Sequence, residues 1–181
     1  MSDELDVLKL VTQRLDTAGI AYMLTGSMAM SYYARPRLTR DIDIVIEVST
    51  KDVERLASLF RADFYCDSDM IQGAVQHEGM FNLIHTDSVV KVDFIVRQRS
   101  AYRREEFKRR RCVHVDGDPI WIAAPEDLLL SKLVWAKEGQ SAVQLDDSHN
   151  LLESVADLDW EYIDLWAPQL TVTALLRDLR K

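Results

Sequence analysis

The feature that most constrains this chain is a short acidic strand pattern at residues 41–46, which reads Asp-Ile-Asp-Ile-Val-Ile. Successive side chains of a β-strand point to opposite faces, so Asp41 and Asp43 project together from one face. Two ionised carboxylates side by side repel each other, and a divalent cation removes that repulsion. The pattern therefore predicts a strand over 41–48 with one acidic face. The simpler alternative for an isolated Asp-x-Asp is a turn or a solvated strand face.

A second feature precedes this strand. Residues 20–25 have the pattern of a short buried strand, Gly26 and Ser27 break it, and a short helical pattern over 27–34 ends before Pro36. A helix that opens at Gly-Ser offers backbone N–H groups and the positive end of its dipole, which together suit a phosphate. A Gly-Ser pair alone often just ends a strand. It indicates a phosphate site here because the acidic strand follows it.

A third carboxylate, Asp93, lies inside the apolar stretch at residues 89–96. Lys91 is two residues away and therefore shares its face. If this strand pairs beside residues 41–48, three carboxylates and one ammonium group converge. Hard oxygen ligands of this kind favour Mg²⁺ or Mn²⁺. The alternative is that Asp93 is an outward-facing residue balanced by Lys91.

The remaining pattern predicts an α/β (α+β) chain. Helical spacing covers residues 3–18, strand candidates at 80–85 and 89–96 are joined by a short turn, and a second hairpin surrounds 116–118. From Pro125 onward the pattern is helical throughout. We therefore expect a core at residues 1–123 and a C-terminal helical segment at 124–181 that packs on it.

Composition excludes several classes of protein. The 181 residues are 48% hydrophobic and 29% charged, and the apolar runs are far shorter than a membrane span. The two cysteines suggest no disulfide framework, and the acidic N-terminus lacks a secretory pattern. These features predict a cytoplasmic protein without a membrane partner.

The charge is unevenly distributed. The net charge of −8 argues against strong non-specific nucleic-acid binding, yet residues 97–111 carry eight basic and two acidic residues. This basic run could bind the backbone of an RNA. The alternative is an exposed helix with Glu105–Arg109 and Glu106–Arg110 pairs at i,i+4 spacing.

The stretch LTGSMAMSYYARPRLTRDIDIVIE at residues 24–47, followed by VKVDFIV at 90–96, resembles the signature of the nucleotidyltransferase superfamily with the polymerase β-like fold. The segment RLTRDIDI and the Lys-x-Asp pattern look closest to AbiEii/AbiGii-type and related minimal nucleotidyltransferases of toxin–antitoxin and phage-defence systems. The match covers roughly residues 20–96, and the helices around PEDLLLSKL and DDSHNLLE resemble those of the same group more loosely. The resemblance implies a mixed β-sheet core flanked by helices.

The resemblance also implies a function. The chain would be an enzyme that transfers a nucleoside monophosphate from an NTP, such as ATP, to a hydroxyl of RNA or protein, with a cognate toxin or antitoxin as a partner. Asp41, Asp43 and Asp93 would be catalytic and would bind the metal ions. The nucleotide would contact Gly26, Ser27, Arg37, Arg40, Lys91 and Lys132. For Arg37 and Arg40, ordinary surface charge is an equal alternative.

Two other functions stay open at this point. One is a nucleotide-binding partner or antitoxin without turnover, which the complete carboxylate trio disfavours. The other is transfer to a small molecule such as an aminoglycoside, for which an acidic pocket would be expected rather than the basic run.

Overall fold

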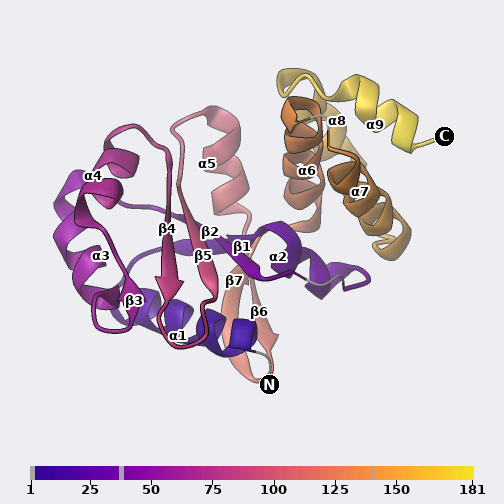
Figure 1. Ribbon diagram of the computed structural model, residues 1–181. Helices are drawn as coiled ribbons and strands as arrows, with labels where there is room; N and C mark the ends of the chain where they lie inside the picture. The colour runs from indigo at the N-terminus through magenta and orange to yellow at the C-terminus, as the bar shows by residue number, and fades with distance from the viewer. Residues whose placement is uncertain (1–2, 37–38, 140) are drawn as a thin grey trace.

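The structure is a computed structural model that describes residues 3–36, 39–139 and 141–181, and within these ranges a seven-stranded mixed sheet is flanked by helices (Figure 1). The spatial order of the strands is β3-β4-β5-β2-β1-β7-β6. The strands are β1 (Tyr22–Thr25), β2 (Asp41–Ile46), β3 (Phe64–Tyr65), β4 (Met80–His85), β5 (Lys91–Val96), β6 (Arg111–Val115) and β7 (Asp118–Ile122). The mixed sheet with flanking helices confirms the predicted fold class.

The helices fill the connections and the C-terminal third. They are α1 (Asp3–Thr17), α2 (Gly26–Tyr33), the 3₁₀ turn η1 (Thr50–Asp52), α3 (Val53–Phe60), α4 (Ser68–Gln76), α5 (Ala101–Lys108), α6 (Pro125–Gly139), α7 (Ala142–Ser154), α8 (Trp160–Gln169) and α9 (Thr173–Leu179). The sequence pattern did not specify α4, and it offered α5 only as an alternative to an RNA-binding segment.

The centre of the sheet is built from β1, β2 and β5. Strand β2 is antiparallel to β1 and parallel to β5, although β2 and β5 lie far apart in the sequence. The register places Asp43 beside Asp93 and beside Thr25. The three segments that carry the predicted site are therefore direct neighbours.

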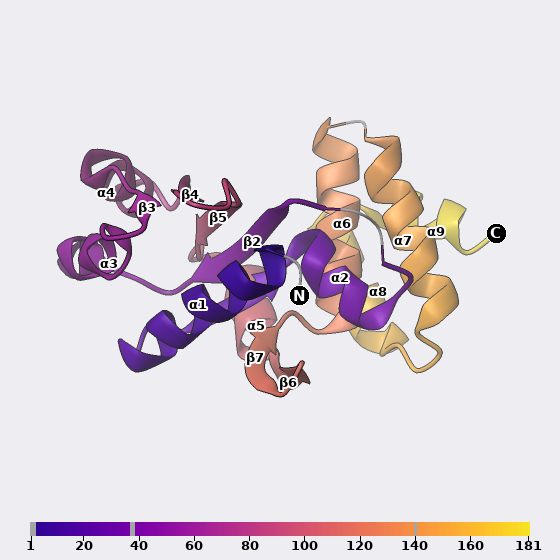
Figure 2. The ribbon, with the colours of Figure 1, turned by 60° about the horizontal axis from the view of Figure 1, so that its bottom comes forward.

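One face of these strands is the apolar core. Ile42, Ile44 and Ile46 are completely buried, as expected for alternate residues of an amphipathic strand. The ring of Phe60 on α3 packs against Phe94 of β5, with 5.7 Å between the ring centroids. Helix α1 runs alongside β2 in the view of Figure 2. The opposite face is thereby left to carry the polar residues.

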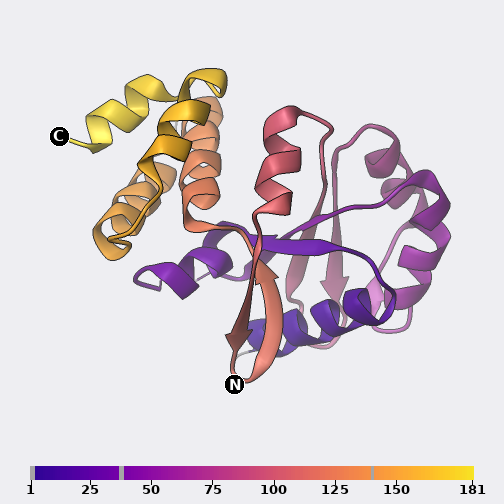
Figure 3. The ribbon, with the colours of Figure 1, turned by 180° about the vertical axis from the view of Figure 1, so that it is seen from behind.

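Helices α6–α9 gather on the other side of the molecule from α3 and α4 (Figures 1 and 3). Most of α6 is buried, because it packs against α2, α7, α8 and α9. Tyr33 at the end of α2 donates a hydrogen bond to the carbonyl of Ala123, 2.9 Å away, just before α6 begins. The division into 1–123 and 124–181 stays a prediction. No helix in the described ranges is both long and apolar enough to span a bilayer.

Candidate active site

Three carboxylates and one ammonium group share one face of β2 and β5. The register sets Asp41 beside Lys91 and Asp43 beside Asp93, so all four side chains project to the same side. The Lys91 Nζ lies 2.8 Å from Asp93 Oδ2 and 3.5 Å from Asp41 Oδ1. The structure therefore places the residues that the sequence predicted to converge on one face of two adjacent strands.

Gly26 lies directly against the second of these carboxylates. It begins α2 with φ of +65°, a conformation that favours glycine, and a Cβ built on it would lie 2.0 Å from Asp43 Oδ2. The absence of a side chain thus lets the amino end of α2 approach the Asp43 carboxylate. Ser27 follows in the first turn and is buried. This places the proposed phosphate-binding turn beside the carboxylates.

The surroundings of Asp43 disfavour the ionised form of its carboxyl group. Burial raises the pKa of this carboxyl to about 6, and the negative charges of Asp93 and Asp41 act in the same direction. Lys132 and Lys91 oppose the rise in pKa. A carboxyl whose ionised form is disfavoured in this way is a candidate for a functional group, because it gains from a cation.

Lys132 reaches the site from α6. It is only 1% exposed, and its Nζ donates a hydrogen bond of 2.7 Å to Asp147 Oδ2 on α7. Its charge still lowers the pKa of Asp43, as noted above. The sequence related the stretch DDSHNLLE, which contains Asp147, only loosely to the family, and no local spacing indicates that Asp147 pairs with a lysine fifteen residues earlier.

The donor set suits a hard divalent cation, although the side chains are not gathered around one point. In the described ranges, no group of three or more His, Cys, Asp or Glu side chains is arranged to hold a metal ion as it stands. The carboxylates of Asp93 and Asp41 instead contact the Lys91 ammonium. Oxygen ligands at the edge of a solvent-accessible face nevertheless fit Mg²⁺ or Mn²⁺, and the ammonium group indicates that the site attracts positive charge.

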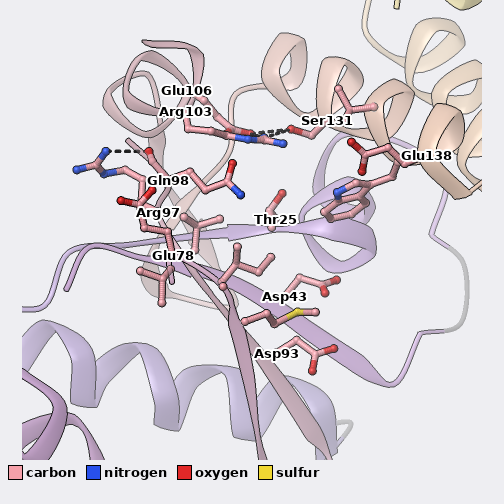
Figure 4. A pocket seen from close by; sticks show the side chains of 17 residues that line it. Thr25, Asp43, Glu78, Asp93, Arg97, Gln98, Arg103, Glu106, Ser131 and Glu138 are labelled. Carbon is pink, nitrogen blue, oxygen red and sulfur yellow. Dashed lines mark hydrogen bonds and ion pairs between the residues drawn. The ribbon is translucent and has the colours of Figure 1, made fainter. Parts of the chain in front are cut away.

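A cavity of about 440 Å³ lies next to the carboxylates, between the sheet and helices α5 and α6 (Figure 4). Asp43 and Asp93 line one end, and Trp135 and Glu138 of α6 line another wall. The other polar side chains in its lining belong to Thr25, Glu78, Arg97, Gln98, Arg103, Glu106 and Ser131. Its size is that of a site for a small molecule.

The roof of this cavity is a buried polar cluster that the sequence did not reveal. Arg103 Nη1 donates to both oxygens of Glu106, at 3.0 and 2.9 Å, and to Ser131 Oγ at 2.8 Å. The Ser131 hydroxyl also donates to Glu106 Oε1 at 2.7 Å. The cluster fastens α5 to α6 above the cavity, as the dashed lines in Figure 4 show.

The basic run at 97–111 is largely committed to contacts within the protein. Arg109 bonds Asp127 and Glu126 at 3.1 Å each, in place of the expected pair with Glu105. The Arg110 guanidinium lies over the rings of Phe107 and Trp121 rather than against Glu106. Further ion pairs in this run join Arg97 to Glu47, Arg99 to Glu78, Arg103 to Glu106, Lys108 to Glu105 and Arg111 to Glu126. The expected i,i+4 pairs are therefore wrong in detail.

The two remaining predicted site residues lie before β2. Arg40 is exposed and adjoins Asp41, whereas Arg37 lies outside the described residues. Asn82 was not predicted, yet it is the lateral neighbour of Asp93 on β4. This pairing could have been predicted from the turn at Thr86–Ser88, because a hairpin turn fixes the register of the strands that it joins.

Comparisons with known proteins concern the fold. No protein-family model and no curated protein matches the sequence. Among solved structures, the chain is similar to an antigenic nucleotidyltransferase-like protein from Paracoccidioides brasiliensis, with a TM-score of 0.61 and 20% identity over 97% of this chain and 93% of that one. It is also similar to ANT(2'')-Ia in complex with adenylyl-2''-tobramycin, with a TM-score of 0.57 and 14% identity over 94% and 98% of the two chains. At these identities the comparisons establish a nucleotidyltransferase-like fold.

Proposed function

We propose that this protein is a metal-dependent nucleotidyltransferase that moves a nucleoside monophosphate from an NTP to an acceptor hydroxyl. The observation that carries the proposal is the lateral register of Asp43 with Asp93, on the face that Gly26 approaches. The site thus combines an acidic cluster for cations with a helix start suited to phosphate. The nucleotidyltransferase-like fold supports the same class of reaction.

The reaction that this site would support is a displacement at phosphorus. The acceptor oxygen bonds the α-phosphorus, the bond to the oxygen that bridges the α- and β-phosphates breaks, and pyrophosphate leaves with that electron pair. The hydroxyl proton passes to a carboxylate oxygen of Asp93. When bound to Asp41, Asp43 and Asp93, Mg²⁺ or Mn²⁺ would neutralise the negative charge of the triphosphate.

The chain's other residues position the substrates. The backbone N–H groups of Gly26 and Ser27 would hold the phosphates at the start of α2. Lys91 and Lys132 add positive charge on the same side, and Arg40 extends it toward solvent. Positioning and charge neutralisation are the main contributions of a protein to phosphoryl transfer.

A specific observation favours a small cationic acceptor over RNA or protein. The cavity beside Asp43 and Asp93 also carries the carboxylate of Glu138, whereas Glu78 and Glu106 in its lining are paired with Arg99 and Arg103 of the basic run. The fold neighbour ANT(2'')-Ia was solved with adenylyl-2''-tobramycin, a nucleotidylated small molecule. We therefore propose a hydroxyl-bearing small cation as the second candidate acceptor, while transfer to RNA or protein and a toxin–antitoxin setting stay predictions.

One experiment tests the class of reaction and separates the acceptors. The purified protein is incubated with Mg²⁺, each α-labelled NTP, and total tRNA, cell-lysate protein or a panel of polyamino alcohols. Label transferred to one acceptor class identifies it. We expect Asp43→Asn to abolish transfer, whereas Asp87→Asn, on the exposed turn before β5, retains it. Transfer by Asp43→Asn at the wild-type rate, or no transfer to any class, would count against the proposal.

A further inference from the structure

Lys91 bridges carboxylates that belong to two different strands. It is the first residue of β5 and the lateral neighbour of Asp41, the first residue of β2. Its Nζ contacts Asp93 at 2.8 Å along its own strand and Asp41 at 3.5 Å on the adjacent strand. A single ammonium group therefore occupies the space between two of the three carboxylates.

This contact places a positive charge between two carboxylates that would otherwise repel each other. The side chain of a lysine is an ammonium cation at neutral pH. Lys132 also acts on this site, but its own ammonium contacts Asp147 at 2.7 Å. Lys91 thus supplies the direct counter-charge for Asp93 and Asp41.

An ammonium group and a divalent cation would need the same oxygens. We propose, on the basis of the proposed function, that Lys91 is an internal counter-cation that holds Asp41 and Asp93 in the free protein and is displaced from them when Mg²⁺ or Mn²⁺ binds. The side chain can leave, because it is 38% exposed and carries a flexible four-carbon stem. The displaced ammonium stays on the face that Gly26 approaches, where it can contact an NTP phosphate.

The inference is tested by metal binding without nucleotide. Mn²⁺ affinity is measured by electron paramagnetic resonance of the free ion for the wild type and for Lys91→Gln. We expect Lys91→Gln to bind Mn²⁺ about tenfold more tightly, because the metal no longer competes with an ammonium group a few ångströms away. Equal or weaker binding by a folded Lys91→Gln variant would overturn the inference.

Two further variants make the result specific. Lys181→Gln removes the same charge at the C-terminus, where the side chain is exposed, and should leave Mn²⁺ affinity unchanged. Asp43→Asn should weaken the affinity. If wild type binds Mn²⁺ in an Asp43-dependent way but Lys91→Gln matches it, the inference fails while the proposed metal site stands. If no protein binds Mn²⁺, both fail.

A second readout follows the lysine itself. Acylation of Lys91 by an amine-reactive ester is quantified by mass spectrometry with and without Mg²⁺, and the exposed Lys51 serves as the internal reference. Displacement predicts a several-fold rise in Lys91 labelling when Mg²⁺ is present and no change at Lys51. Labelling of Lys91 that is unaffected by saturating Mg²⁺ would contradict displacement.

Discussion

The carboxylate of Asp43 occupies the space that a side chain at position 26 would need at the start of α2. The glycine is held at φ of +65°, and the space for its missing Cβ is filled by the Asp43 carboxylate. Gly19 has nearly the same dihedral, φ of +64°, but nothing lies within 4 Å of its Cβ position. A substitution at Gly19 therefore tests the left-handed backbone conformation alone, whereas a substitution at Gly26 also tests the steric contact with Asp43.

This pair gives a first prediction. Gly19→Ala should destabilise the protein by about 1 kcal/mol, because only the left-handed conformation is penalised. Gly26→Ala should cost about 2–4 kcal/mol and abolish transfer, because the methyl group also displaces the Asp43 carboxylate. Urea unfolding and the transfer assay measure the two effects. Equal stability losses and retained activity in both variants would contradict the close approach.

Asp43 illustrates how a functional group can reduce stability. Its pKa in the folded protein is about 6, above the ordinary value of 3.8, so the folded state binds the proton more tightly than the unfolded state. Stability is therefore expected to fall as pH rises between these two values. Above about pH 6 the full cost of ionisation is present.

A second prediction follows for metal-free protein. Asp43→Asn should match the wild type near pH 4 and exceed its stability by about 1–3 kcal/mol at pH 8, since the neutral amide avoids that cost. Thermal melts in EDTA across this range provide the measurement. Asp87→Asn, in the exposed turn, should show no such divergence. If the stability difference between Asp43→Asn and wild type were the same at all pH values, burial would not raise the pKa of Asp43.

At the level of the helices, α5 and α6 are joined by an ion cluster centred on Arg109. Its guanidinium bonds Asp127 and Glu126, both buried in the first turn of α6, and lies 3.7 Å from the Tyr162 ring centroid on α8. The Tyr162 hydroxyl donates to Asp127 at 2.6 Å. Burial raises the pKa of Asp127 to about 6 despite these partners. The cluster links the end of α5 to α8 and to α6, which forms one wall of the cavity.

A third prediction concerns this junction. Arg109→Ala should lower the free energy of unfolding by about 3–5 kcal/mol at pH 7, because the buried carboxylate of Asp127 loses its guanidinium partner and Glu126 keeps only the longer contact with Arg111. The neighbouring Lys108→Ala should change it by less than about 0.5 kcal/mol, because that exposed side chain only approaches Glu105 at 4.0 Å. Urea titrations of both variants make the comparison. Similar small losses would show that the cluster contributes little to stability.

For the molecule taken together, the distribution of charge matters more than its sum. The net charge is −8, and the one strongly basic segment is paired with Glu47, Glu78, Glu126 and Asp127. Such pairing reduces the number of cations that are free to replace the counterions of a polynucleotide. The sheet meanwhile presents its carboxylates to a cavity bounded by α5 and α6.

A fourth prediction follows from this charge distribution. The protein should show no salt-sensitive binding to total tRNA, so that the affinity measured by filter binding stays weak from 50 to 200 mM salt. The salt slope is the decisive quantity, because each phosphate neutralised by a cation contributes about one unit to it. A slope of several units would contradict this expectation and favour RNA as the acceptor.

Most of the strands and helices, and the face on which the acidic residues lie, could be predicted from the sequence, because both depend on short-range periodicity. Alternation in 41–46 fixed which face carries Asp41 and Asp43, and Lys91 shares the face of Asp93 for the same reason. The Gly-Ser pair marked the start of α2. The fold class followed from the order of strands and helices.

The tertiary structure decided which of these elements meet. The parallel pairing of β2 with β5, the approach of Gly26 to Asp43, and the Lys132–Asp147 and Arg109–Asp127 contacts all join residues that no local spacing relates. It also revealed that most arginines of the basic run form ion pairs with acidic residues elsewhere in the chain. Such contacts depend on how distant segments pack once loops close, whereas a sequence pattern records only the conformation that each segment prefers by itself.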